Sequence, residues 1–147
     1  MSVSNSLRRL LGIRDLQEEQ SKLALESALG ELRRLENALR ITFERGRRGR
    51  GLIHASAQSG QLTDRLAGLE EDRAVNLHVA ALEPRIDVKV EEIEELRNAY
   101  LSKRVERRQA ETLIQEAEAR EAMETNRRGQ QSIDDWYNLR KFRDSGQ

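Results

Sequence analysis

The chain has 147 residues, of which 35% are charged and only 3% are aromatic. Because large aromatic side chains dominate globular cores, this composition favours long helices over a thick globular fold. Lys plus Arg and Asp plus Glu each number 26, and the resulting zero net charge argues against a dedicated nucleic-acid binder. The absence of cysteine excludes disulfides and cysteine metal sites and fits a reducing compartment.

The N-terminal residues carry no apolar segment typical of a signal peptide, and no apolar run approaches the ~18 residues of a membrane span. We therefore expect a cytoplasmic protein.

The clearest predicted element is the helix that contains residues 25–39, where apolar residues recur three and four residues apart. This is the spacing of a coiled-coil seam, which needs a partner helix because it cannot bury itself. The seam residues are Leu25, Ala28, Leu32, Leu35 and Leu39. We expect this first helix over about residues 7–44.

Towards the N-terminus, the same spacing reaches the polar residues Arg14, Glu18 and Ser21. Polar seam residues lower stability, fix the register and leave a surface available to another molecule.

Residues 44–51, with the sequence ERGRRGRG, predict a break, because each glycine lowers helix propensity by about 1 kcal/mol relative to Ala. We expect a Gly/Arg-rich turn and an irregular or short-helix region over residues 45–83, with apolar periodicity resuming at Leu62. Ile41 and Phe43 lie off the seam just before the break, either in local packing or as an exposed apolar spot. The Arg-Gly run is interpreted as a solvated turn, or else as a basic tip for an acidic partner.

Pro84 predicts a kink or a new helix start, because proline removes a helical hydrogen bond. Helical spacing then continues from Ile86 through Val90 and Ile93, and Gly129 has the character of a C-terminal cap. We therefore expect a long helix over about residues 84–128.

A short C-terminal helix is expected over about residues 132–143, beginning at a variant capping box formed by Ser132 and Asp135. It contains Trp136 and Tyr137, the residue types that dominate binding energy at interfaces. These two residues either bind a partner or fold back onto the long helices.

Together these elements predict a single all-α domain over residues 1–147, an antiparallel two-helix coiled-coil hairpin. It would be an elongated rod with a break or kink in the middle. The first helix could pair with about residues 84–128, with residues 46–83 making the turn. Alternatively, it could pair with roughly residues 62–102 and leave the C-terminal residues as a free helix. We expect a monomer, although a dimer of hairpins remains open.

No catalytic constellation is recognisable. His54 and His78 do not have metal-ligand spacing, the glycines do not form a phosphate-binding loop, and a thin rod offers no cleft that would shift a carboxylate pKa. We therefore predict a protein that is not an enzyme and has no metal or cofactor.

Two stretches carry a family pattern. SLRRLLGIRDLQEEQSKLALESALGELRRLENAL has a leucine-rich start with an Arg-Asp step at Arg14 and Asp15. ERRQAETLIQEAEAREAMETNRRGQQSIDDWYNLRK has an Ile-Asp-Asp step at Ile133, Asp134 and Asp135. In both, the chain resembles the FliJ-type proteins, the soluble stalk proteins of the bacterial flagellar (type III) export apparatus.

The resemblance implies a shaft that binds the ring of the export ATPase and also contacts the membrane export gate and export chaperones. The chain would then be cytoplasmic and peripherally associated with the inner-membrane export apparatus. Candidate ATPase-binding residues are Arg14, Asp15, Glu18, Arg120, Ile133, Asp134, Asp135, Trp136 and Tyr137. Candidate gate-binding residues are Ile41, Phe43, Arg47 and Arg48. The alternative function is a generic coiled-coil scaffold or chaperone-like adaptor.

Overall fold

A computed structural model describes residues 4–146 of the chain. These residues form two α-helices that pack against each other, α1 (Asn5–Ser59) and α2 (Leu62–Ser145), with no strand among them. The expected all-α class is therefore confirmed. The contacts divide the chain into two compact units: residues 20–101 form one, and the N-terminal segment up to Glu19 forms the other with the segment from Ser102.

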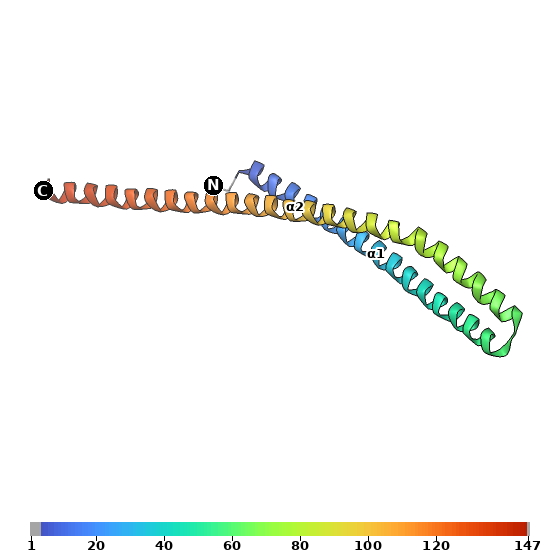
Figure 1. Ribbon diagram of the computed structural model, residues 1–147. Coiled ribbons are helices and arrows are strands. Elements are labelled where there is room, and N and C mark those ends of the chain that lie inside the picture. The colour runs from blue at the N-terminus through green and yellow to red at the C-terminus, as the bar shows by residue number, and fades with distance from the viewer. Residues whose placement is uncertain (1–3, 147) are drawn as a thin grey trace. The chain divides into compact units, whose positions relative to one another are not determined.

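Within the unit of residues 20–101, only Gly60 and Gln61 separate the two helices. Gly60 has a φ of 71°, the left-handed conformation with which glycine commonly ends a helix. Its backbone N–H donates to the Ser56 carbonyl at 2.8 Å, so one carbonyl of the last turn is satisfied. Figure 1 shows the two helices of this unit running side by side from the turn.

The predicted break at residues 44–51 is wrong, and so is the irregular region over residues 45–83. Both stretches are helical except for Gly60 and Gln61. Helices in proteins are stabilised mainly by packing of one face against a neighbour, which here outweighs the low intrinsic propensity of glycine.

The glycines of the Arg-Gly segment provide that packing. Gly46 and Gly49 are buried and continue the spacing of three and four residues beyond Thr42, which is also buried. A Cβ atom on Gly46 would lie 3.1 Å from the Val75 Cγ1 atom, and one on Gly68 would lie 2.7 Å from the Gly49 carbonyl oxygen. These glycines therefore let the two backbones approach closely.

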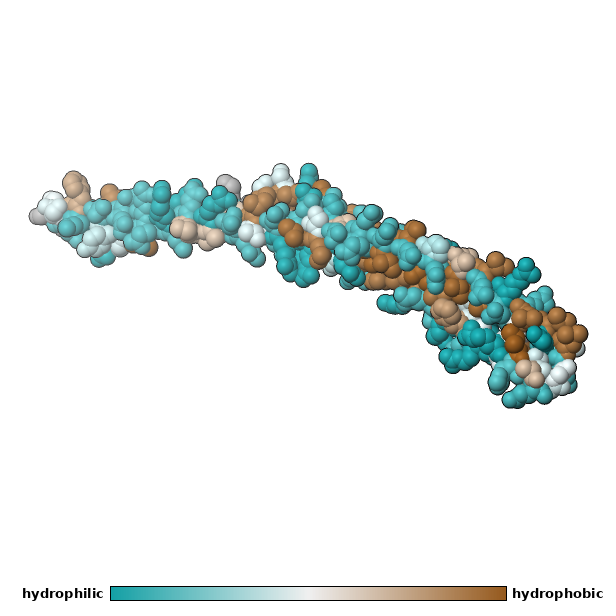
Figure 2. All heavy atoms as spheres, viewed as in Figure 1, coloured by the Kyte–Doolittle hydropathy of each residue, from teal (hydrophilic) through white to brown (hydrophobic). Residues whose placement is uncertain are grey.

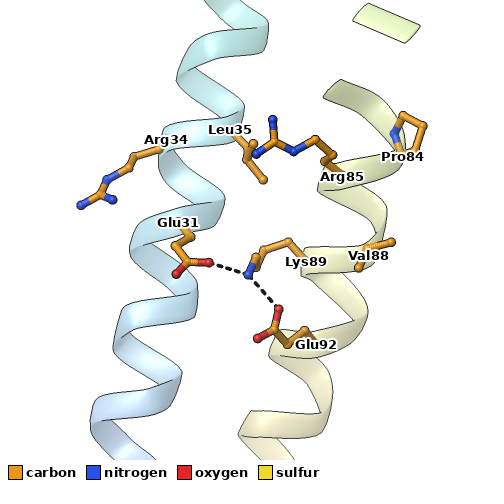
Figure 3. A pocket seen from close by; sticks show the side chains of 8 residues that line it. All are labelled: Glu31, Arg34, Leu35, Pro84, Arg85, Val88, Lys89 and Glu92. Carbon is orange, nitrogen blue, oxygen red and sulfur yellow. Dashed lines mark hydrogen bonds and ion pairs between the residues drawn. The ribbon is translucent and has the colours of Figure 1, made fainter. Parts of the chain in front are cut away.

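α2 is continuous from Leu62 to Ser145, so the predicted new start at Pro84, the cap at Gly129 and the separate helix over residues 132–143 are not observed. Pro84 lies on the side of α2 turned away from α1 (Figure 3). Proline removes the helical bond to the Ala80 carbonyl, and both Ala80 and Pro84 are exposed, so the missing bond falls on the side of the helix away from the packed face. Gly129 lies inside the helix without any contact that requires glycine.

Neither predicted pairing holds entirely. In the unit of residues 20–101, Glu31 of α1 contacts Lys89 and Arg45 contacts Glu71, so residue numbers fall along α2 as they rise along α1. This is the direct pairing through the Arg-Gly segment. In the other unit, Arg14 contacts Glu106, which lies outside residues 62–102 and within residues 84–128, the stretch of the first predicted pairing.

The core is a narrow line between the helices. Its buried α1 members are small, namely Ala28, Thr42, Gly46, Gly49 and Ser56. Its buried apolar members on α2 are Val75, Leu82, Ile93 and Ala110. Among the described residues, no helix is long and apolar enough to cross a membrane.

Candidate partner-binding surfaces

The N-terminal candidates, Arg14, Asp15 and Glu18, lie on the first turns of α1. Residues 14 and 18 share one face because they are four apart. Arg14 donates to Glu106 at 2.9 Å, and Glu18 accepts from the Nε atom of Arg107. The Glu18 side chain is only 14% exposed, whereas that of Asp15 is 57% exposed. Arg14 and Glu18 thus hold α1 against α2, and Asp15 is the member most accessible to a partner.

Arg107 is the centre of this ion-pair cluster. It contacts Glu18, lies 2.6 Å from Glu111 through its NH1 atom and 4.0 Å from Asp15. The hydrogen bond to Glu18 is the main cause that raises the pKa of Arg107, with a further contribution from Glu111. The cluster therefore fixes the register of the two helices with charge where apolar seam residues are absent.

The C-terminal candidates form an exposed stretch of α2. Trp136 is 60% exposed and Tyr137 61%, and Ile133 is similarly accessible. The Arg140 guanidinium lies 5.4 Å from the Trp136 ring centroid, within the range of a cation–π interaction. The alternative in which Trp136 and Tyr137 pack back onto the helices is therefore not observed.

Asp134 and Asp135 are exposed beside these aromatic residues, and Gln130 donates to Asp134 at 3.1 Å. Arg120 is also exposed, and its Nε atom donates to the Glu116 carbonyl of its own helix at 3.4 Å.

The structure does not bring the two candidate sets together. Ile133 follows Arg107 by 26 positions, which corresponds to about 39 Å along α2 at 1.5 Å per residue. Every residue from 122 to 146 is exposed, so this stretch of α2 has no covering element among the described residues. The predicted ATPase-binding residues therefore form two separate groups. One group belongs to the ion-pair cluster between α1 and α2, and the other lies on the uncovered C-terminal stretch of α2.

The predicted gate-binding residues lie within α1, between residues 41 and 48. Ile41 and Phe43 are about half exposed on either side of the buried Thr42, and residues two apart point about 200° apart around a helix. Ile41 therefore shares a side with Arg48, while Phe43 shares the opposite side with Arg47. All four candidates are accessible, but they do not form one patch.

Two cations sit beside the Glu71 carboxylate on the Ile41 side. Arg45 donates to Glu71 at 2.7 Å, which is the main cause that lowers the pKa of Glu71, and Arg48 lowers it further by its charge. The charge of Arg48 is thus partly compensated, whereas Arg47 has no acidic partner among residues 4–146.

Lys89 is a core-facing residue that the sequence pattern missed, because Val90 was expected in the seam. Its side chain is 17% exposed, and its Nζ atom lies 2.5 Å from Glu31 and 2.8 Å from Glu92 (Figure 3). The bond to Glu31 is the main cause that raises the pKa of Lys89 and lowers that of Glu31. An open groove of about 610 Å³ lies beside this bridge, with Pro84 and Val88 on its rim.

α2 has a second apolar face that the periodicity resuming at Leu62 does not distinguish from the covered one. The leucines at positions 62, 66, 69 and 77 recur with helical spacing, yet the residues that pack on α1 are Gly68, Val75, Val79 and Leu82. The exposed face, here called the outer stripe, consists of Leu62, Leu66, Leu69, Leu77, Ala80, Pro84 and Val88. Figure 2 shows apolar side chains near the turn and along the outer edge of α2. The signal in the sequence was that α2 has two apolar faces on opposite sides over residues 62–88, one of which is the outer stripe.

Residues 4–146 contain no cluster of three or more His, Asp or Glu side chains that could hold a metal ion. Comparison of the chain with protein-family models, with curated proteins and with solved structures finds no match.

Proposed function

We propose that this chain is a non-enzymatic stalk of the bacterial flagellar export apparatus, which binds the export ATPase ring and links it to the export gate and chaperones. The observation that carries the proposal is the bare C-terminal stretch of α2. A helix that stays uncovered from residue 122 to its end at Ser145 and displays Trp136 and Tyr137 is a surface suited to another molecule. The resemblance to FliJ-type proteins suggests that this molecule is the export ATPase ring.

The proposed architecture is an antiparallel coiled-coil hairpin. Positions spaced by three and four residues follow α1 from Leu7 to Ser56 and α2 from Gly68 to Glu121, and nearly all of them are covered to some degree. Small buried residues and ion pairs alternate along this line. Such a seam supports a thin shaft, since it maintains register without a wide apolar core.

The bare stretch suits a reversible contact inside a ring. Its surface is largely hydrophilic, with a few apolar or aromatic side chains, so it can bind and release without burying a large apolar area. Trp136 and Tyr137 are the proposed anchors, and Asp134, Asp135 and Arg120 are the proposed charged contacts. Asp15 is the one N-terminal candidate that remains accessible for the same partner.

The proposed contact with the export gate uses residues 43–47 of α1. Phe43 and Arg47 present one apolar and one cationic side chain on the same side of the helix. A partner with an acidic rim around an apolar pocket fits this pair better than it fits Ile41 and Arg48, because Glu71 partly neutralises Arg48. This contact would keep a cytoplasmic chain at the inner membrane without inserting it.

The test is the ATP hydrolysis rate of the purified export ATPase with and without the full chain at low salt. A stalk is expected to bind the ATPase and raise its rate. A chain that neither co-elutes with the ATPase nor changes its rate contradicts the proposal. That result favours the scaffold or chaperone-like adaptor, which requires no ATPase contact.

A further inference from the structure

The outer stripe is an apolar face with no partner in the described chain. Its four leucines and Val88 are between 48% and 69% exposed. The members recur three or four positions apart within residues 62–69 and again within residues 77–88, and Arg73 lies on the same face between these two apolar runs. The face spans about 40 Å at 1.5 Å per residue. Scattered exposed leucines need no explanation, but two aligned apolar runs on one helix face indicate a binding surface.

The stripe is opposite the face that α1 covers. Leu66 and Gly68 are about 200° apart around α2, and Leu77 and Val75 have the same relationship. Gly68 and Val75 are buried against α1, whereas Leu66 and Leu77 point away from it. α2 therefore has two apolar faces over residues 62–88, and one helix of this chain covers only one of them.

We propose that a second copy of this chain covers the outer stripe, with the two α2 helices packed antiparallel. Charge complementarity supports this occupant. Arg65 lies on one flank of the stripe near its start, and Glu83 and Asp87 lie on the same flank near its end. A two-fold axis between antiparallel helices brings the same flank of both copies together. Arg65 of each copy then meets Glu83 and Asp87 of the other.

The register that makes this charge match also aligns the apolar residues. When residue numbers of the two copies add to about 150, Leu62 lies opposite Val88 and Leu66 opposite Pro84. Leu69 then lies opposite Ala80, so the two apolar runs of each copy pack on each other, and Leu77 lies opposite Arg73 near the two-fold axis. A face of this length is compatible with the roughly 800 Å² per partner that stable interfaces bury.

An anionic membrane fits the stripe less well. The stripe and its flanks carry the acidic residues Glu70, Asp72, Glu83 and Asp87 and the cations Arg65, Arg73 and Arg85, so there is no cationic excess. Amphipathic helices that bind anionic lipid carry an excess of Lys and Arg on the polar face. This proposal concerns residues 62–88 and does not depend on the proposed contact with an ATPase.

The test is the solution mass of the full chain by light scattering over a concentration series. One variant carries Arg65→Glu, and a second carries Glu83→Arg with Asp87→Arg. The wild type is expected at twice the chain mass of 16.9 kDa. Each variant alone places like charges together, so its dissociation constant should rise at least about tenfold, as expected for close interfacial charge pairs. An equimolar mixture restores opposite charges and should restore the dimer mass.

Two controls separate the interface from folding and from general charge effects. Arg127→Glu reverses an exposed cation outside the stripe and should leave the mass unchanged. Helix content by circular dichroism should be the same in all variants. A wild-type mass of one chain at every concentration overturns the proposal. If that monomer also binds anionic vesicles, a membrane covers the stripe in place of a second copy. A dimer that persists in each charge variant also overturns it, because another surface then forms the contact.

Discussion

Gly68 of α2 approaches Gly49 of α1 so closely that a Cβ atom on Gly68 would lie 2.7 Å from the Gly49 carbonyl oxygen. The same Cβ would lie 2.7 Å from the Ile53 Cγ1 atom. Backbone contact therefore replaces large side chains where the Arg-Gly segment packs on α2, and the segment is helical because of this contact.

Gly68→Ala should lower the free energy of unfolding by about 1–3 kcal/mol, because overpacking a tight contact forces the backbones apart. Gly51→Ala is the matched control, since nothing lies within 4 Å of a Cβ at that position. It should raise the free energy of unfolding by up to about 1 kcal/mol through helix propensity. Urea unfolding followed by circular dichroism measures both. Equal effects of the two substitutions would disprove the close contact.

Acid should weaken the folded chain through Glu31 and Glu71. Their bonds to Lys89 and Arg45 lower the pKa of both carboxyls below the ordinary value of 4.5. A lowered folded-state pKa gives stability that is present above pH 4.5 and is lost as the pH falls through the folded value. Urea unfolding at a series of pH values measures this dependence.

The double variant Glu31→Gln with Glu71→Gln is the control for that series. It should be less stable than the wild type at neutral pH and should lose less stability on acidification below pH 4.5. Parallel pH profiles of the wild type and the variant would show that these two carboxylates do not contribute.

Amide hydrogen exchange should distinguish the covered from the bare part of α2. Isolated helices are marginal in water, so residues 125–144 should exchange on the order of 100-fold faster than residues 86–110. Mass spectrometry of peptides from a single exchange reaction compares the two ranges under identical conditions. Equal protection would mean that another element covers the C-terminal stretch.

The sequence predicted some parts of this structure and misassigned others for identifiable reasons. The seam over residues 25–39 and its polar continuation at Arg14 and Glu18 follow from spacing alone, and α1 places both on the covered face. The break at the Arg-Gly segment was wrong because glycine propensity is local, whereas close helix approach is a property of two segments. Continuation of the spacing through Gly46 and Gly49 was the available signal.

The outer stripe shows a different limit. Leucines mark the exposed face of α2 near the turn, while Gly68 marks the covered one. Choosing the more hydrophobic face of α2 as the one that packs on α1 therefore selects the outer stripe, which is exposed. Only the tight fit to Gly49 distinguishes them, and that fit requires coordinates.

The aromatic pair on the bare stretch should account for much of the affinity for the export ATPase. Trp136→Ala with Tyr137→Ala should weaken binding on the order of 30-fold, the effect of a hot spot of about 2 kcal/mol. Phe142→Ala is the matched control, because Phe142 is also exposed but lies about 240° around the helix from Trp136. Binding titrations by calorimetry compare the variants. Loss of affinity with Phe142→Ala alone would place the contact on another face.

The most direct test of the proposed stalk uses Trp136, the single tryptophan of this chain. Its fluorescence can be followed in the full chain while an export ATPase variant without tryptophan is added. Insertion into the ring should shift the emission to shorter wavelength and protect the indole from a soluble quencher, because the exposed ring becomes buried. If neither the emission wavelength nor the quenching of Trp136 changes at saturating amounts of the ATPase, residues 122–146 are not the segment that enters the ring.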